Sequence, residues 1–460
     1  MKKYALVFML IASLFVSAAN ADTLRTYYAG EASEGFVKAH PNLEIVYNDF
    51  KGIGGRDFRN TYEMLSALIT GSFNFDVFKV GTGQFDMHKI MDKGYCEDLS
   101  QSETIKEAFN LLYPNIAKEL IRDGKIYAVP KVIQCETLIA DKEGWQEAGY
   151  TQEDVPQSFP ELLDFLENWS RRASEEPNDS IKVKNTWDET LYGPYNYTVW
   201  LAQMLVESHI MQCEYAKVPL RFNDEEFLEL LSRCKEVGTM IYETEPEPNA
   251  PFALVEDYVE TFHWEDGISK RKISVRLNDG QPKLFPAKLD AAAVYSRSDN
   301  KEIAIAFLED LATQRIDERW NKPMPERSLL YKDAPPIKNG NQEYEIASDK
   351  RHIAEIQEKL KDDSISLSDR EDLEVQLVKF EDMLEDSLQN EYDLSPEDLA
   401  DYRLVADDLF FPTPGPFFVA TDTGQNMLNM IDRFAADNMS AQEFVTQLDR
   451  MARMVELEEQ

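Results

Sequence analysis

The eight residues Asp123-Gly124-Lys125-Ile126-Tyr127-Ala128-Val129-Pro130 decide the fold class of this 460-residue chain. Asp-Gly-Lys predicts a turn, and the apolar residues after it predict a short strand that is closed by proline. The strand pattern nevertheless continues through residues 132–139, with the polar residues Gln134 and Glu136 in its middle. A strand that runs on past a proline is typical of a chain that crosses from one domain to another. Because ligand sites favour domain interfaces, the pattern predicts a hinge beside a binding site.

The first 21 residues have the features of a cleaved export signal. Lys2 and Lys3 are followed by an apolar run from Ala5 to Val16 and by the A-x-A motif Ala19-Asn20-Ala21. The run is too short to span a membrane, and the residue directly after the cleavage point is Asp22, not a cysteine. We therefore expect a mature protein that begins at Asp22 and is periplasmic or secreted, and that is not a lipoprotein.

The charge of the chain excludes some classes of partner. It carries 85 acidic and 48 basic residues, which gives a net charge of −37 at pH 7. Phosphate binding needs clustered Lys and Arg, so this balance argues against nucleic acid and against anionic lipid. The length predicts two or three domains, and no later stretch is apolar enough to cross a membrane. These features predict a soluble exported protein whose charge serves mainly solubility.

The cysteine pattern leaves the redox state open. Export permits disulfides among Cys96, Cys135, Cys213 and Cys234. We favour a Cys213–Cys234 bridge, which would close a short local loop, and four free buried thiols are the alternative. There is no C-x-x-C motif and no histidine close enough to suggest zinc, so we expect no metal and no cofactor.

The apolar periodicity predicts an α/β fold. Strand patterns at residues 23–28, 43–47 and 76–80 alternate with helical patterns at residues 32–39 and 62–70. Strands that alternate with helices imply a mainly parallel sheet. Ligands of such sheets bind beyond the carboxyl ends of the strands.

After the crossing, helical patterns dominate. Strand-like alternation returns at residues 273–297, which predicts a second crossing near Pro286–Ser296. Residues 345–390 predict an acidic helical hairpin, in which a capping box at Ser368-Asp369-Arg370-Glu371 opens the longer apolar stripe. We interpret this hairpin as an insertion.

Five landmarks occur in the order in which one protein family has them. They are Phe36-x-x-x-x-Pro41, Asp76-Val77-Phe78, Lys93-Gly94-Tyr95 before Asp98-Leu99-Ser100, Asp123 to Pro130, and Ser298-Asp299-Asn300-Lys301-Glu302-Ile303-Ala304 before Phe307-Leu308. In these landmarks, which follow an export signal, the chain resembles the extracellular solute-binding proteins that serve ABC importers. Within them it resembles the carbohydrate-type group that includes maltose-binding protein. The resemblance runs over residues 23–332 and 400–455.

The resemblance implies a two-lobe, type II-like periplasmic binding protein fold, in which each lobe is a mainly parallel sheet flanked by helices. It places residues 22–133 and 288–332 in the N-terminal lobe. Residues 134–287 and 333–460 form the C-terminal lobe, which contains the acidic helical insertion 345–390. Hinge closure would bury the solute between the lobes, and the closed form would dock on a membrane permease. We interpret the insertion as solvated, with a permease-facing role as the alternative.

Three loops supply polar candidates for binding the solute. Thr82 and Gln84 follow the 76–80 strand, where the family often has Trp or Asp. This departure argues against a large, maltose-like stacked oligosaccharide. Glu31 and Asp49 follow the first two strands and are candidates for bonding hydroxyls or an amine, with exposed surface carboxylates as the alternative. Gln134 falls where the family often has a sugar-binding carboxylate; the alternative is a polar hinge residue that bonds backbone.

Aromatic side chains supply the remaining candidates, because the CH face of a sugar packs on a flat ring. They are Tyr195, Tyr197, Trp200, His263, Trp264, Trp320 and Phe417. The first three fall where the family presents an aromatic from its second lobe, and Trp264 falls where it has a stacking tryptophan. Ordinary packing is the alternative for Tyr195, Tyr197, Trp200 and Phe417. An exposed surface position is the alternative for His263.

Together these features predict a non-catalytic, monomeric solute-binding component of an ABC importer, which delivers a sugar or oligosaccharide to permease membrane subunits. A cationic solute such as a polyamine is the alternative within this class. An exported glycan hydrolase is the alternative from another class, because two of the many carboxylates could form a catalytic pair. The chain has no G-x-S-x-G and no H-E-x-x-H motif, and we expect no enzymatic activity.

Overall fold

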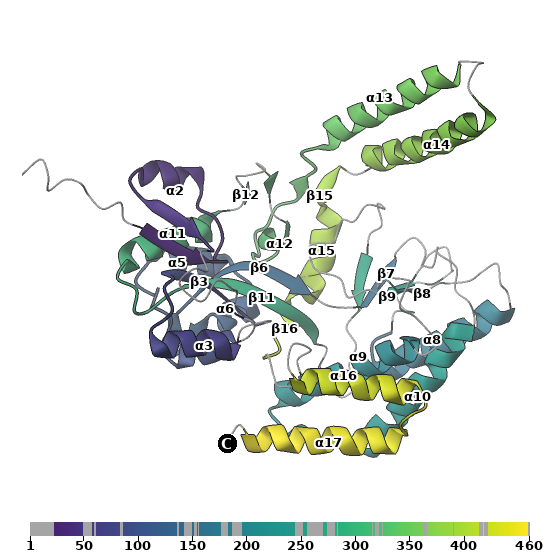
Figure 1. Ribbon diagram of the computed structural model, residues 1–460, viewed down its shortest axis with the longest axis horizontal. Helices are drawn as coiled ribbons and strands as arrows, with labels where there is room; N and C mark the ends of the chain where they lie inside the picture. Colours follow the sequence, from purple (N-terminus) through teal and green to yellow (C-terminus); the bar gives the residue numbers. More distant parts are fainter. Residues whose placement is uncertain are drawn as a thin grey trace, which may run out of the picture. The chain divides into compact units, whose positions relative to one another are not determined.

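The computed structural model describes residues 23–48, 58, 61–82, 86–135, 138–141, 150, 154, 156–175, 183–185, 196–243, 252–254, 270–273, 281–282, 284–314, 316–317, 322–323, 325–361, 366–389, 391–413, 417 and 422–458 (Figure 1). The chain divides into two compact units. Unit 1 comprises Met1–Val132 and Leu289–Asn321, and unit 2 comprises Ile133–Lys288 and Lys322–Gln460. Two of the three boundaries fall inside β6 (Val129–Cys135) and β11 (Phe285–Val294), so these strands carry the chain from one unit into the other. The third boundary falls between Asn321 and Lys322.

Unit 1 is built on a mixed sheet. Its parallel part has β1 (Thr23–Tyr27) between β2 (Glu44–Tyr47) and β3 (Val77–Gly81). β11 pairs antiparallel with β3, and β6 pairs with β11. Four of the five residues of β3 are buried, as in a strand that is covered on both faces. The three strands that the alternating pattern predicted are therefore confirmed.

Helices flank this sheet. They are α2 (Glu34–Ala39), α3 (Thr61–Thr70), α4 (Met87–Asp92), α5 (Glu103–Leu111), α6 (Pro114–Glu119) and α11 (Lys301–Thr313). Side-chain oxygens of Ser33, Asp86 and Ser102 accept the free backbone N–H groups at the starts of α2, α4 and α5. A short strand, β12 (Ile316–Asp317), follows α11.

A buried carboxylate joins two of the sequence landmarks. Asp76, which precedes β3, is only 7% exposed. Its Oδ1 accepts hydrogen bonds from Ser298 Oγ at 2.5 Å and Asn300 Nδ2 at 3.2 Å, and its Oδ2 accepts from Arg25 N at 2.8 Å. A buried carboxylate must have its lone pairs satisfied. This requirement explains why the Asp76 and Ser298–Asn300 motifs belong to one pattern.

The turn in the opening motif is present. Asp123 and Gly124 have φ angles of 51° and 75°, and they connect β4 (Ile121–Arg122) to β5 (Lys125–Ile126). Two left-handed residues in a row are typical of an Asp-Gly hairpin turn. Lys125 Nζ lies 3.1 Å from Asp98 Oδ2. Burial raises the pKa of Asp98, but hydrogen bonds from Ser100 and the Lys125 ammonium outweigh it, so the pKa lies below its usual value.

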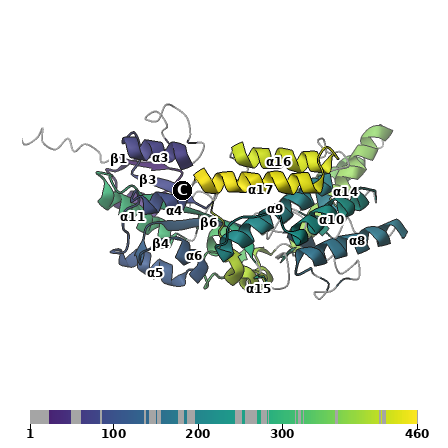
Figure 2. The same cartoon turned by 90° about the horizontal axis from the view of Figure 1, so that it is seen from below.

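Unit 2 is mainly helical. Its principal helices are α8 (Phe159–Glu175), α9 (Asn196–Ala216), α10 (Glu225–Glu243), α16 (Asp422–Ala435) and α17 (Ala441–Glu458). All five contribute to one hydrophobic core, in which Trp169 and Phe222 are among the largest fully buried side chains. α16 and α17 lie side by side in both ribbon views (Figure 2). α15 (Pro396–Val405) and η6 (Ala406–Asp408) precede them in the chain.

The four-stranded sheet of unit 2 has the order β10-β7-β9-β8. Its strands are β7 (Leu138–Asp141), β8 (Val183–Asn185), β9 (Phe252–Leu254) and β10 (Lys270–Ile273). β7 runs antiparallel to both of its neighbours, and only β8 and β9 are parallel. The sheet is thus mixed, and the expectation of a mainly parallel sheet is wrong for this unit. Pairing directions depend on connections between distant segments, which local alternation does not encode.

Other short elements complete unit 2. They are β13 (Lys322–Pro323), α12 (Pro325–Ser328), β14 (Ile337–Lys338), β15 (Tyr392–Leu394) and β16 (Leu409–Phe410). β16 pairs in parallel with the first two residues of β11.

The predicted acidic hairpin consists of α13 (Gln342–Leu360) and α14 (Leu367–Gln389), which run along each other (Figure 1). β14 and β15 pair antiparallel at its base. The predicted capping box at Ser368 is wrong, because the helix start lies two residues earlier: α14 begins at Leu367, and Ser366 Oγ accepts the backbone N–H of Asp369. Leu388, near the end of α14, is 52% exposed.

The suggested Cys213–Cys234 disulfide is also wrong, because both residues are free thiols, as is Cys96. Cys213 Sγ lies 3.6 Å from His209 Nε2, whereas Cys234 is fully buried in the hydrophobic core of unit 2. Of Cys135, only the backbone position in β6 is described. Among the described residues, no helix is both long and apolar enough to cross a membrane.

Candidate functional site

The carboxyl ends of β1, β2 and β3 meet at one edge of the unit 1 sheet. The strands run in parallel and end at Tyr27, Tyr47 and Gly81. Ligands of α/β sheets bind at such edges. We therefore built the candidate site of unit 1 from the residues that follow these three strands.

Two of these residues, Tyr28 and Asn48, have left-handed backbones, with φ angles of 46° and 52°. Asn48 Oδ1 accepts the backbone N–H of Tyr28 at 2.6 Å, and Asn48 N donates to Thr26 O at 2.8 Å. A tyrosine in this conformation is strained by about 1–2 kcal/mol, and such strain clusters at functional sites. Neither residue was predicted as a site residue from the sequence. The signal that could have indicated them is a polar or aromatic residue directly after a strand.

Lys131, on β6, joins the same edge. Its Nζ donates a hydrogen bond to the backbone oxygen of Tyr28 at 2.7 Å. Tyr47 Oη accepts the backbone N–H of Ala32 at 3.1 Å, and burial raises the pKa of that hydroxyl. Gly30 has φ 113°, and a Cβ there would lie 3.1 Å from Leu311. The loop after β1 is therefore fixed by neighbours from several elements.

Thr82 and Glu31 are the predicted residues that lie at this edge within the described part of the chain. Thr82 is 4% exposed, and its Oγ1 accepts the backbone N–H of Leu289 at 2.8 Å. Its side chain therefore holds β11 beside the end of β3. Glu31 is exposed, and its backbone oxygen accepts a hydrogen bond from Gln314.

In unit 2, Tyr197 and Trp200 lie in the first turns of α9. Both are half-buried and pack against the hydrophobic core, and burial raises the pKa of Tyr197. Gly238 of α10 allows α9 to approach closely, because a Cβ there would lie 2.6 Å from the backbone nitrogen of Thr198. Phe417 is 8% exposed and lies in the core near Phe222, as its packing alternative predicts.

The remaining predicted site residues are not placed. Gln134 belongs to β6, and only its backbone is described. The others lie outside the described residues: Asp49, Gln84, Tyr195, His263, Trp264 and Trp320.

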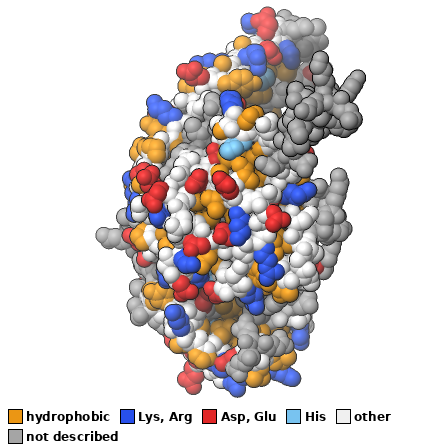
Figure 3. All heavy atoms as spheres, turned by 90° about the vertical axis from the view of Figure 1, so that its left-hand side faces the viewer, with side chains coloured by type: hydrophobic (Ala, Val, Ile, Leu, Met, Phe, Trp, Pro, Cys, Tyr) orange, Lys and Arg blue, Asp and Glu red, His pale blue; other side chains and the backbone are white. Residues whose placement is uncertain are grey.

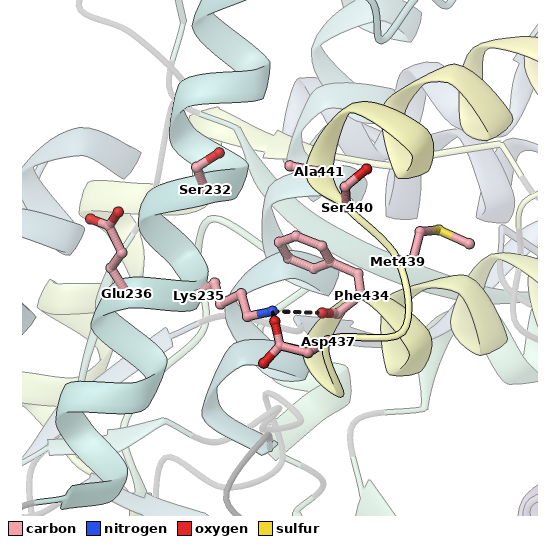
Figure 4. A pocket seen from close by; sticks show the side chains of 8 residues that line it. All are labelled: Ser232, Lys235, Glu236, Phe434, Asp437, Met439, Ser440 and Ala441. Carbon is pink, nitrogen blue, oxygen red and sulfur yellow. Dashed lines mark hydrogen bonds and ion pairs between the residues drawn. The ribbon is translucent and has the colours of Figure 1, made fainter.

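A hollow of about 390 Å³ lies on unit 2 between α10 and the α16–α17 turn (Figure 4). Lys235 Nζ enters it, pairs with Asp437 and donates to the backbone oxygen of Phe434 at 3.2 Å. A lysine that bonds a carbonyl in the last turn of a helix stabilises the end of that helix. These contacts give the hollow a structural role.

Neither the charges on the face drawn in Figure 3 nor the metal-ligating side chains of the described residues indicate a further site. On the face shown in Figure 3, acidic side chains are interspersed with basic ones across the described surface. No three His, Cys, Asp or Glu side chains within the described ranges are grouped so that they could hold a metal ion.

Comparisons with known proteins place the chain in a family. Residues 63–313 match the family model described as bacterial extracellular solute-binding protein. A search of curated proteins finds no match.

Solved structures share the fold. The ABC substrate-binding protein Lmo0181 from Listeria monocytogenes, in complex with cycloalternan, has 12% identity and a TM-score of 0.50, covering 94% of this chain and 97% of its own. The sugar-binding protein MalE from Xanthomonas citri has 13% identity and a TM-score of 0.51, covering 95% and 98%. A putative binding protein, msme, from Bacillus subtilis has 14% identity and a TM-score of 0.52, covering 96% and 100%. At these identities the structures show a shared fold, and the family match, which spans more than half of the chain, shows that this protein belongs to the bacterial extracellular solute-binding proteins.

Proposed function

We propose that this protein is the non-catalytic solute-binding component of an ABC importer and that its solute is a sugar or oligosaccharide. The carboxyl edge of β1, β2 and β3 carries the proposal, in a chain of the solute-binding family. The Tyr28 ring is exposed, and hydrogen bonds to Asn48 and Lys131 fix the loop after β1. This arrangement suits a ligand that is held by stacking and hydrogen bonds. The Lmo0181 protein, which was solved in complex with cycloalternan, and the sugar-binding protein MalE support the sugar class for this chain.

The proposed mechanism uses both lobes. Residues 22–133 and 288–332 form the N-terminal lobe, and residues 134–287 and 333–460 form the C-terminal lobe. Rings of the second lobe stack on the solute, and polar groups bond its hydroxyls. The proposed contacts are Tyr195, Tyr197, Trp200, His263 and Trp264 among the rings of the second lobe, Trp320 among the rings of the first lobe, and Glu31, Asp49, Gln84 and Gln134 among the polar residues. Hinge closure then buries the solute.

The cellular context is part of the proposal. Residues 1–21 direct export and are removed, without lipid attachment. The mature monomer delivers its solute to the membrane subunits of an ABC permease. The acidic hairpin 345–390 is a solvated insertion with no part in binding.

Thermal-shift screening of the mature protein against sugars and amines tests the proposal. A ligand at a hundred times its Kd stabilises the folded state by about 2.7 kcal/mol, which raises Tm by roughly 5–10 °C. We expect such a shift with at least one sugar, and we expect the sugar to be recovered unchanged. A shift with polyamines and with no sugar would overturn the sugar assignment, and hydrolysis of labelled glycans would overturn the absence of catalysis.

A further inference from the structure

Tyr28 combines three properties that packing alone does not require. It follows the central parallel strand β1, its backbone is left-handed at φ 46°, and its side chain is 42% exposed. A non-glycine residue keeps such a conformation only when its surroundings impose it. Burial does not account for the side chain, because much of the ring faces solvent.

Groups from three elements impose this conformation. Asn48, after β2, accepts the Tyr28 N–H at 2.6 Å, and Lys131, on β6, donates to the Tyr28 carbonyl at 2.7 Å. The buried ring of Tyr27 contacts the Tyr28 ring edge-on, with the centroids 5.1 Å apart. The peptide groups on both sides of Tyr28 are therefore bonded, and the ring is oriented before any ligand arrives. Pre-orientation reduces the entropy lost on binding.

We infer that the Tyr28 ring is the stacking surface for the CH face of a sugar ring in unit 1, and that Asn48 and Lys131 are positioning residues that hold it. The inference rests on the proposed function and adds a residue that the family resemblance did not supply. At the end of β3, Val80 and Gly83 stand where the family often has Trp or Asp. Tyr28 provides a flat apolar surface at the end of a neighbouring strand.

The first test compares side chains at this position by isothermal titration of the mature protein with glucose, maltose and xylobiose. Tyr28→Phe keeps the ring and should bind the best of these sugars within about threefold of wild type. Tyr28→Ala should raise the Kd about tenfold or more, since burial of half an aromatic side chain is lost. Tyr344→Ala, at a 73% exposed tyrosine on α13, is the matched control and should leave the Kd unchanged.

The second test separates function from folding. Glycine tolerates a left-handed backbone and alanine does not, so Tyr28→Gly should melt at a higher temperature than Tyr28→Ala while binding sugar equally poorly. For the positioning residues, Asn48→Gly and Lys131→Met should weaken binding. Asn48→Asp and Lys131→Arg, which keep the acceptor and the donor, should restore it.

The outcomes distinguish the Tyr28 stacking inference from the proposed sugar-binding function. Wild-type sugar binding that Tyr28→Ala leaves intact overturns the inference and leaves the proposed function standing. A Tyr28→Gly variant that melts below Tyr28→Ala shows that the backbone is not strained and also overturns it. Failure of the wild type to bind any of the three sugars counts against the proposed sugar class and removes the inference with it.

Discussion

Gly238 offers a sharp test of how unit 2 is packed. It lies on α10 against the first turn of α9, and a Cβ there would be 2.5 Å from Thr198 Oγ1, 2.6 Å from Thr198 N and 2.8 Å from Thr198 Cα. Carbon atoms in van der Waals contact are about 3.5–4.0 Å apart. Two of the three close atoms belong to the backbone, so Gly238→Ala cannot be accommodated by turning a side chain, and the helices must separate.

The size of the effect follows from two opposing contributions. Overpacking of this kind costs about 2–3 kcal/mol, and alanine recovers about 1 kcal/mol of helix propensity relative to glycine. We therefore expect Gly238→Ala to lower the free energy of unfolding by about 1–2 kcal/mol and Tm by roughly 2–8 °C.

Urea denaturation followed by far-UV circular dichroism measures this change. Gly340→Ala is the matched control, because a Cβ there meets nothing within 4 Å, and it should stay within about 0.5 kcal/mol of wild type. Because Tyr197 and Trp200 lie in the displaced turn of α9, Gly238→Ala should also weaken solute binding. Stability equal to that of the Gly340→Ala variant would refute the close approach of the two helices.

Three further predictions concern unit 2 and the thiols. Burial lowers the pKa of His209, and the opposing effects of the Arg221 carbonyl and Asp224 are weaker. The unfolded chain therefore binds a proton more readily than the folded protein, and the free energy of unfolding should fall as the pH drops below about 6.5. In denaturation curves measured from pH 7.5 to 5, His209→Asn should make this free energy depend less on pH. Replacing residues 340–390 with a two-residue turn should preserve solute affinity, because β14 and β15 already pair at the base of the hairpin. A tenfold loss of solute affinity in a titration would show that the hairpin has a role in binding. Cys96 and Cys234 are buried, which raises the pKa of both thiols, so a thiol reagent should label them only after unfolding, and rapid labelling of the native protein would contradict their placement.

Local patterns were sufficient to predict much of unit 1. Alternation gave β1, β2 and β3, and Asp-Gly gave the turn between β4 and β5, since each depends on residues that are close in sequence. The family landmarks also reflect physical constraints. Asp76 and Ser298 lie far apart in the chain, yet they share one buried hydrogen bond.

Features that depend on distant segments were not predictable. The mixed pairing of the unit 2 sheet is fixed by connections that alternation does not record. Cys213 and Cys234 are close in sequence, but one lies beside His209 and the other in the core.

The candidate site was the least predictable part. The left-handed backbone of Tyr28 is imposed by Asn48, which follows β2, and by Lys131 on β6. Composition and periodicity near Tyr28 contain no sign of that constraint. Thr82 was predicted at the correct strand end, but its hydroxyl bonds the backbone of Leu289, a contact that depends on how β11 returns to the sheet.

Isothermal titration of the mature protein with sugars, followed by chromatography of the same samples, tests whether the protein binds a sugar without cleaving it. We expect saturable binding of at least one sugar, with a stoichiometry of one and complete recovery of the unmodified sugar. Saturable binding of a polyamine with no response to any sugar, or the appearance of cleaved sugar products, would contradict it.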